Sequence, residues 1–325
     1  MIITMTPNPA LDLTFEVRSL AVGGVNRADN IRQDAGGKGI NISRALHQHG
    51  YETVAIFPAG GTAGAELLQR LTGLKIPIMA IPTNTVTRTN ITVAETSGTT
   101  TKLNEPGSAL SETDITLLLH SVADILQTSK KPSIVIGAGS LPIGSPPDFY
   151  ARLADIAHKY RALPVIDSSG EPFANAIERG GLYLVKPNDA ELAELAGKKM
   201  TAIGDIVAAA RDIIAAGNNQ VLVTLGANGA LLVTRDAHVW AGGAPLLPRS
   251  TVGAGDLTLA GYLARAVANA ADTADTADTA DTADTADTAS DASVATNATH
   301  IAAVIDASDT NTDKANKVAL KAAVA

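Results

Sequence analysis

The sequence contains no cysteine among its 325 residues. Disulfide bonds, thiolate metal ligands and cysteine nucleophiles are therefore excluded, and the chain suits a reducing compartment. Long hydrophobic runs are also missing, because nowhere do about 18 apolar residues follow one another. The segment Met1 to Phe15 lacks a basic stretch followed by an apolar core. We expect neither a membrane span nor a signal peptide, and the cytoplasm is the expected location.

Basic residues are outnumbered by acidic ones, which gives a net charge of −8. The imbalance has a single source, since residues 271–313 hold ten aspartates and no lysine or arginine. Without those ten charges the remaining chain has a net charge of +2. A nearly neutral chain without a basic stripe is not typical of nucleic-acid binding. We therefore expect small molecules as partners.

The acidic stretch begins with the triplet Ala-Asp-Thr, which occurs six times between Ala271 and Thr288. Such triplets offer no large apolar side chain whose burial would offset the entropy lost on ordering. A period of three is also far shorter than the roughly 20 residues or more of solenoid repeats. We expect a disordered insertion over residues 271–299, which separates residues 1–270 from a helical C-terminal remnant over residues 300–325.

Short β-branched runs alternate with amphipathic segments over much of the chain, a pattern typical of a parallel sheet with crossover helices. The hydrophobic fraction of 46% is that of a soluble globular protein. Four runs are predicted to be buried strands: Ser133 to Gly137, Pro164 to Asp167, Leu182 to Val185 and Val221 to Thr224. Three early segments are richer in threonine or alternate in polarity, and they predict a small second sheet: Leu11 to Val17, Val25 to Gln33 and Thr87 to Glu95. A helix is predicted after Ser111, which forms a capping pair with Asp114.

The segment Ser250 to Asp256 (STVGAGD) precedes a predicted helix and is the strongest candidate for an anion site. Two glycines around a small alanine allow backbone amides to converge on a phosphate, and the helix dipole adds positive potential there. Asp256 is placed to accept a proton from a hydroxyl that attacks that phosphate. Asp256 could equally be a first-turn acid that only stabilises the helix. The residue types are compatible with both interpretations, a proton acceptor and a helix-stabilising acid.

Two further motifs combine glycine or proline with polar side chains at predicted helix starts. In Gly36 to Asn41 (GGKGIN), Lys38 and Asn41 could contact a phosphate and hydroxyl groups, although a plain glycine-rich turn explains the same letters. This segment is not a Walker loop, because its glycine spacing and the residue after Lys38 do not match. In Lys186 to Glu191 (KPNDAE), Asn188 and Glu191 share one helix face, where their oxygens suit Mg²⁺. Simple capping of the helix by Asn188 and Glu191 is the alternative.

Taken together and in order, six motifs resemble those of the ribokinase-like carbohydrate kinases of the PfkB family. They are TPNPALD (Thr6 to Asp12), AGGKGIN (Ala35 to Asn41), GSLP (Gly139 to Pro142), KPNDAE (Lys186 to Glu191), TLGANGA (Thr224 to Ala230) and STVGAGD (Ser250 to Asp256). The resemblance covers roughly residues 1–270. It implies a three-layer α/β/α fold with a mostly parallel sheet and a small β-sheet lid, built from strands at about 11–33 and 87–104. It also implies a homodimer formed through the lid.

Within this family, three segments resemble the substrate segments of 1-phosphofructokinases: Gly23 to Asp29, Thr87 to Val93 and Thr99 to Ser111. The implied reaction is the ATP-dependent phosphorylation of fructose 1-phosphate to fructose 1,6-bisphosphate. Two other segments, Phe57 to Gly61 and Asp167 to Gly170, are similar to those of the family's minor 6-phosphofructokinase, and tagatose-6-phosphate kinases share AGGKGIN. Those two activities stay open as alternatives.

The resemblance also implies roles for individual residues. The general base is Asp256, and the anion hole is formed by Gly253, Ala254 and Gly255. Mg²⁺ and its waters are placed at Asn188 and Glu191. The sugar pocket is matched by Asp12, Gly37, Asn41 and Ser140, and the cations for the substrate phosphate are Arg27, Lys38 and Arg88. The ATP side is matched by Lys186, Thr224, Gly226 and Gly229, together with Gly253 and Gly255.

The sequence departs from the family pattern in two places. Leu257 stands where a serine usually follows the GAGD motif, which is expected to alter packing near the anion hole. In relatives, a helix at this point of the chain walls the adenine pocket. Here the Ala-Asp-Thr insertion intervenes, and Val318 to Ala325 resembles only the beginning of that helix, so weak ATP binding is expected. A non-catalytic sugar-phosphate-binding protein is therefore a second hypothesis, against which the presence of Asp256 argues. A nicotinamide dehydrogenase is disfavoured, because no G-x-G-x-x-G follows the first strand.

Overall fold

The computed structural model describes residues 1–129, 131, 133–242 and 253–278, with side chains described as far as residue 267. The described residues form a main sheet in the order β13-β12-β11-β10-β9-β8-β1-β4-β5. Its strands are β1 (Ile2–Met5), β4 (Thr53–Ala59), β5 (Ile78–Pro82), β8 (Ile134–Ala138), β9 (Leu163–Asp167), β10 (Leu184–Val185), β11 (Val221–Thr224), β12 (Ala230–Val233) and β13 (His238–Ala241). All neighbours from β5 to β11 are parallel, and the two pairs at the other edge, β11 with β12 and β12 with β13, are antiparallel.

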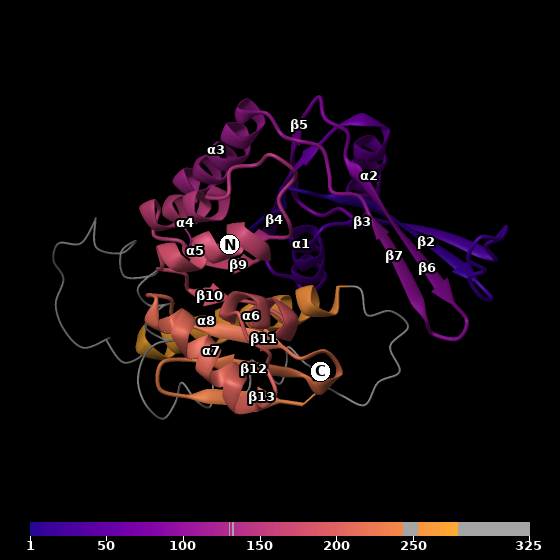
Figure 1. Ribbon diagram of the computed structural model, residues 1–325. Helices are drawn as coiled ribbons and strands as arrows, with labels where there is room; N and C mark the ends of the chain where they lie inside the picture. The colour runs from indigo at the N-terminus through magenta and orange to yellow at the C-terminus, as the bar shows by residue number, and fades with distance from the viewer. Residues whose placement is uncertain (130, 132, 243–252, 279–325) are drawn as a thin grey trace.

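Helices cover both faces of this sheet (Figure 1). On one face the core is completed by α1 (Lys38–Gln48) and α8 (Ala254–Asp278). On the other it is completed by α3 (Glu112–Thr128), α4 (Phe149–Lys159), α5 (Gly170–Arg179), α6 (Asp189–Ala196) and α7 (Ile203–Ala215). Successive residues of one strand face opposite cores, as Ile134 and Val135 do. Burial on both faces explains the continuous apolar runs in the sequence and confirms the predicted three-layer fold.

The smaller sheet has the order β3-β2-β6-β7 and projects from the main layers like a lid (Figure 1). Its strands are β2 (Ala10–Val17), β3 (Asn30–Gly36), β6 (Arg88–Glu95) and β7 (Thr100–Asn104), and α2 (Gly61–Gly73) packs beside β3 and β4. The register places Leu13 opposite Ile91 and Phe15 opposite both Ile31 and Val93. Because neighbours in register share a face, one face of the lid is apolar and the other carries Asp12, Asp34 and Asn90.

The strand expected from Val25 to Gln33 begins five residues later, at Asn30. The Asn26 side chain accepts a hydrogen bond from the Ala21 amide at 2.8 Å and donates one to the Ala21 carbonyl at 2.9 Å. Gly23 adopts a φ of 78°, a conformation that only glycine takes readily. These contacts fold residues 21–26 into a loop, and the expectation of a longer strand was wrong.

The disorder expected from Ala271 is also contradicted in part, because α8 continues to Asp278 through the first triplets. Alanine has the highest helix propensity, and extending an existing helix avoids the cost of nucleation. The rest of the expected insertion, residues 279–299, and the expected remnant at 300–325 lie outside the described residues. None of the described helices combines the length and apolar character needed to cross a membrane.

Candidate active site

The motifs identified in the sequence lie at the carboxyl-terminal edge of the main sheet. Asp167 ends β9, Lys186 directly follows β10, and Thr224 ends β11. The first turns of α1 and α8 reach the same edge, since Asn41 of α1 contacts Asp256 of α8. This edge is where open α/β sheets bind ligands.

Asp256 lies almost completely buried in the first turn of α8. Its Oδ2 accepts a hydrogen bond from Asn41 Nδ2 at 2.9 Å. Burial, followed by the nearby charge of Asp167, raises the pKa of Asp256 to about 6. A carboxylate with this pKa is ionised at neutral pH and is still a usable proton acceptor.

A first-turn acid that only stabilises its helix behaves differently, as Asp205 in α7 shows. Asp205 accepts hydrogen bonds from Thr201 and from the Ala202 amide, and these bonds lower its pKa. The pKa of Asp256 moves in the opposite direction. The Asp256 carboxylate also contacts a residue of another helix, Asn41, which capping alone does not require.

The amides beside Asp256 form the start of α8, where Gly253 takes a φ of 82° and Ala254 is the first helical residue. The first amides of a helix have no acceptor within the helix, and they point toward the N-terminal end. A Cβ built on Gly255 would lie 3.4 Å from Lys186 Nζ. The start of α8 and the Lys186 ammonium therefore face the same space, which suits an anion. Leu257, expected to alter packing near this hole, is exposed.

A fully buried carboxylate, Asp167, joins two of the predicted site lysines. Lys38 Nζ lies 2.7 Å from its Oδ1, and Lys186 Nζ lies 3.1 Å from its Oδ2. Burial opposes ionisation of Asp167, but the charges of Lys186 and Lys38 outweigh it, so the pKa is lowered. Sequence reasoning did not single out Asp167 as a site residue. Its place at the end of a buried strand was the signal available.

Asn188 and Glu191 form a reciprocal capping box at the start of α6. Asn188 Oδ1 accepts from the Glu191 amide at 2.8 Å, and Glu191 Oε2 accepts from the Asn188 amide at 2.8 Å. The capping alternative from the sequence is thus present in the structure. It leaves Glu191 Oε1 available, 3.7 Å from Lys38 Nζ. The described residues contain no cluster of three or more histidines, cysteines or carboxylates suited to a metal.

The predicted sugar pocket lies where the lid meets the main sheet. Asp12 Oδ1 accepts from Asn90 Nδ2 at 2.9 Å, and burial raises the Asp12 pKa. Arg88 donates to the Glu105 carbonyl at 2.8 Å and to the Asn8 carbonyl at 3.1 Å. Asn8 Nδ2 in turn lies 3.3 Å from Ser140 Oγ, which connects the lid to the strand-end loop after β8.

Gly37 and Arg27 have different positions relative to this pocket. Gly37, at the start of α1, has a φ of 130°, and a Cβ there would lie 2.7 Å from Thr6 Cγ2, so a side chain is excluded. Arg27 is exposed in the loop before β3, beyond the end of the lid where Glu16 pairs with Asn30. Asp12 pairs with Asp34 nearer the other end of these strands. One chain therefore does not bring Arg27 to its own sugar pocket.

The predicted nucleotide segment joins β11 to β12 in a short 3₁₀ turn, Gly226–Asn228. Gly226 and Gly229 have φ values of 56° and 90°, so both positions favour glycine, as expected from the sequence. The segment borders an open pocket of about 710 Å³ that includes Asn228 and Trp240 in its wall. Trp240 Nε1 donates to the Asn228 carbonyl at 2.9 Å.

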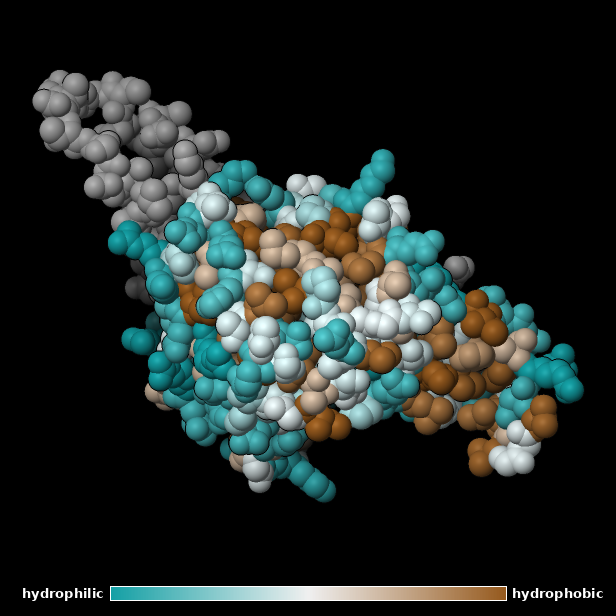
Figure 2. Space-filling view, turned by 90° about the horizontal axis from the view of Figure 1, so that it is seen from above, coloured by the Kyte–Doolittle hydropathy of each residue, from teal (hydrophilic) through white to brown (hydrophobic). Residues whose placement is uncertain are grey.

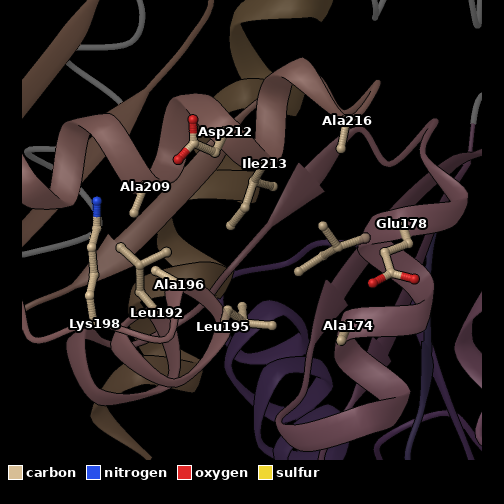
Figure 3. A pocket seen from close by; sticks show the side chains of 11 residues that line it. Ala174, Glu178, Leu192, Leu195, Ala196, Lys198, Ala209, Asp212, Ile213 and Ala216 are labelled. Carbon is tan, nitrogen blue, oxygen red and sulfur yellow. The ribbon is translucent and has the colours of Figure 1, made fainter.

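A separate pocket of about 360 Å³ lies among α5, α6 and α7 (Figure 3). Its lining is mainly aliphatic, with Leu192, Leu195 and Ile213 among its residues. Its charged side chains, Glu178, Lys198 and Asp212, belong to exposed residues. None of the predicted site residues lines it. The predicted site residues that the structure describes therefore lie away from this pocket.

Comparison with known proteins identifies the family of the chain. Residues 5–302 match the pfkB family carbohydrate kinase domain. The chain is 36% identical to the 1-phosphofructokinase of Xanthomonas campestris pv. campestris, over 83% of this chain and 85% of that protein. It is 33% identical to the ATP-dependent 6-phosphofructokinase isozyme 2 of Escherichia coli, over 83% and 87%. The structure of phosphofructokinase-2 from Escherichia coli in complex with substrates and products superposes with a TM-score of 0.76, at 31% identity over 82% of this chain and 87% of that chain.

Proposed function

The chain belongs to the pfkB family of carbohydrate kinases, and we propose that it phosphorylates fructose 1-phosphate with ATP to give fructose 1,6-bisphosphate. The observation that carries the reaction type is the buried Asp256, beside the start of α8 and two lysines. Relatives named 1-phosphofructokinase support the choice of sugar. Fructose 6-phosphate is the alternative, supported by the relatives named 6-phosphofructokinase isozyme 2, and tagatose 6-phosphate stays a third acceptor. We also propose that the protein is located in the cytoplasm.

In the proposed reaction, the free primary hydroxyl of the sugar attacks the γ-phosphorus of ATP. Asp256 accepts the hydroxyl proton, the new O–P bond forms, and ADP leaves with the electrons of the broken bond. The amides of Gly253, Ala254 and Gly255 stabilise the charge that develops on the transferred group. Asn41 orients Asp256 through the hydrogen bond of 2.9 Å.

Mg²⁺ is implied by the family, and the residues at the start of α6 fit it. In proteins Mg²⁺ commonly keeps several waters and uses one or two carboxylates with the substrate phosphates. Glu191 Oε1 is free of the capping box, and Asn188 lies beside it. These two residues would hold the ion and its waters, and the ion would neutralise charge on the ATP phosphates. We propose that Thr224, Gly226 and Gly229 bind on the nucleotide side of the same edge.

The proposed reaction is tested with the purified chain, Mg-ATP and three acceptors in parallel: fructose 1-phosphate, fructose 6-phosphate and tagatose 6-phosphate. We expect kcat/KM for fructose 1-phosphate to exceed the other two by at least tenfold. A preference for another acceptor would transfer the assignment to that sugar. No turnover with any of them, together with sugar-phosphate binding in calorimetry, would support the non-catalytic hypothesis.

We also propose that two copies associate through the apolar face of the lid. Leu13, Phe15, Ile31, Ile91 and Val93 share this face, and Ile31 and the neighbouring Leu103 are 55% and 60% exposed. Figure 2 shows hydrophobic side chains gathered over the projecting end of the molecule. A large exposed apolar patch on a soluble protein commonly marks an interface. Such an association would also bring the exposed Arg27 end of the lid to a second copy.

Leu103→Asp is expected to convert a dimer into a monomer, because it places a charge within the proposed apolar interface. Lys102→Asp is the matched control, since Lys102 lies next in β7 and its side chain is on the opposite face. Light scattering after size-exclusion chromatography gives the mass of each variant. Equal masses for Leu103→Asp and wild type would contradict a lid interface.

A further inference from the structure

Asp167 is a buried charge for which the proposed chemistry has no direct use. It has no exposed surface, and both carboxylate oxygens are engaged by lysines. Removing a carboxylate from water is costly unless it is paired, so its presence requires a compensating arrangement. The two partners come from separate elements, because Lys38 begins α1 and Lys186 follows β10.

The two ammonium groups held by Asp167 face the reacting end of the site. Lys186 Nζ lies beside the first amides of α8, since a Cβ built on Gly255 would be only 3.4 Å from it. Lys38 Nζ lies 3.7 Å from Glu191 Oε1. Asp256 is also among the charges that act on Lys38. The pair of cations is thus bounded by the proposed anion hole, the proposed metal carboxylate and the proposed base.

We propose that Asp167 is a positioning residue that holds Lys38 and Lys186 against the phosphoryl group during its transfer. This role presupposes the kinase activity proposed above, and it changes the assignment of Lys38, which the sequence placed on the phosphate of the sugar. A lysine has four rotatable bonds before its charge, so an unrestrained ammonium is a poorly oriented electrostatic catalyst. Fixing two of them with one buried carboxylate supplies the preorganisation that charge stabilisation needs.

A purely structural role for Asp167 gives different kinetics. Asp167→Asn keeps the size of the side chain and removes one negative charge, so the site becomes more positive. If Asp167 positions the lysines, kcat falls by about 10²–10³-fold because the cations lose their fixed places. The affinity for Mg-ADP stays equal or increases, because an anionic ligand meets a more positive site. If Asp167 only supports the fold, kcat, ADP affinity and thermal stability decline together.

The control is Asp155→Asn. Asp155 is also paired with a cation, Arg179 at 3.0 Å, but this ion pair is exposed. We would measure kcat, the KM of each substrate, Tm, and Mg-ADP affinity by calorimetry on wild type and both variants. Loss of kcat in Asp167→Asn alone, with ADP affinity maintained, is the expected result. A kcat within threefold of Asp155→Asn, or ADP binding weakened more than tenfold, would overturn the positioning role.

Lys38→Met provides a second route if Asp167→Asn fails to fold. If Lys38 acts on the transferred phosphoryl group, Lys38→Met should lower kcat and change the KM of the sugar phosphate little. A tenfold or larger rise in that KM with kcat maintained would place Lys38 on the sugar instead and overturn the inference. Wild type without turnover on any sugar would remove the proposed function itself. The positioning role, which presupposes that function, would then be removed with it. A wild type that turns over, with an Asp167→Asn variant whose kcat stays within threefold of Asp155→Asn, would overturn the positioning role alone.

Discussion

Asp256→Ala is expected to lower kcat by about 10²–10⁴-fold and to leave the fold intact, because it removes the proposed proton acceptor. Asp256 is well placed for this task, since it is nearly buried and its carboxylate is oriented by Asn41. The KM values for both substrates should change little, because the side chain acts on the proton rather than on binding. Steady-state kinetics with saturating Mg-ATP measures the effect.

The pH dependence of the wild type provides a second test of Asp256. Burial raises its pKa to about 6, and the base acts only when ionised. We therefore expect kcat/KM to fall as the pH drops through about 6 and this limb to be absent from the residual activity of Asp256→Ala. An unchanged acid limb in the variant would assign that titration to another group.

Stability should move in the opposite direction to activity. The folded-state pKa of Asp256 lies above its usual 3.8, so the folded state binds a proton more tightly than the unfolded chain. The ionised carboxylate therefore costs stability once the pH rises from about 4 through about 6. Asp256→Asn should raise Tm at neutral pH, and the gain should disappear below pH 4. Asp205→Asn, which removes a true first-turn cap, should lower Tm and leave kcat unchanged.

The fold was largely predictable because its strands are buried on both faces. Runs such as Val221 to Thr224 are apolar throughout, which is typical of central parallel strands. The capping pair at Ser111 also formed as expected, with the Asp114 amide donating to Ser111 Oγ at 3.1 Å. The less accurate predictions concern segments whose local sequence is compatible with more than one secondary structure. These are the loop around Asn26 and the alanine-rich extension of α8.

The candidate site was predictable in its location but not in its connections. The glycine-rich segments at strand ends predicted where an anion would bind, and in the structure these segments lie at one edge of the sheet. The carboxylate that organises this edge was missed because its partners are distant in sequence: Lys38 pairs with Asp167 across 129 positions. No local pattern reports such a pair. The residue types of Asn188 and Glu191 fit both a cap and a metal site. Only the geometry shows that Glu191 Oε2 serves the cap while Oε1 lies outside it, 3.7 Å from Lys38 Nζ.

Asp12→Asn is expected to lower kcat/KM for the sugar phosphate by about 10²-fold, through a higher sugar KM. A partly buried carboxylate such as Asp12 that binds hydroxyls contributes about 1.5–3 kcal/mol for each charge-assisted hydrogen bond. Asp12 is held for this purpose by Asn90 at 2.9 Å, and a Cβ on Gly36 would collide with its carboxylate. The KM for ATP should be unaffected, because the nucleotide segment lies on the main sheet rather than on the lid.

Asp34→Asn is the matched control for Asp12→Asn, because the two aspartates face each other in the register of β2 and β3. Asp34 differs in being paired with Arg32 at 2.8 Å in an exposed ion pair, which contributes little to stability or binding. Kinetics of both variants with each sugar phosphate separates a direct contact from a change in the lid's charge. Equal losses in the two variants would mean that the polar face acts only through its overall charge, and an unchanged sugar KM in Asp12→Asn would remove Asp12 from the sugar pocket.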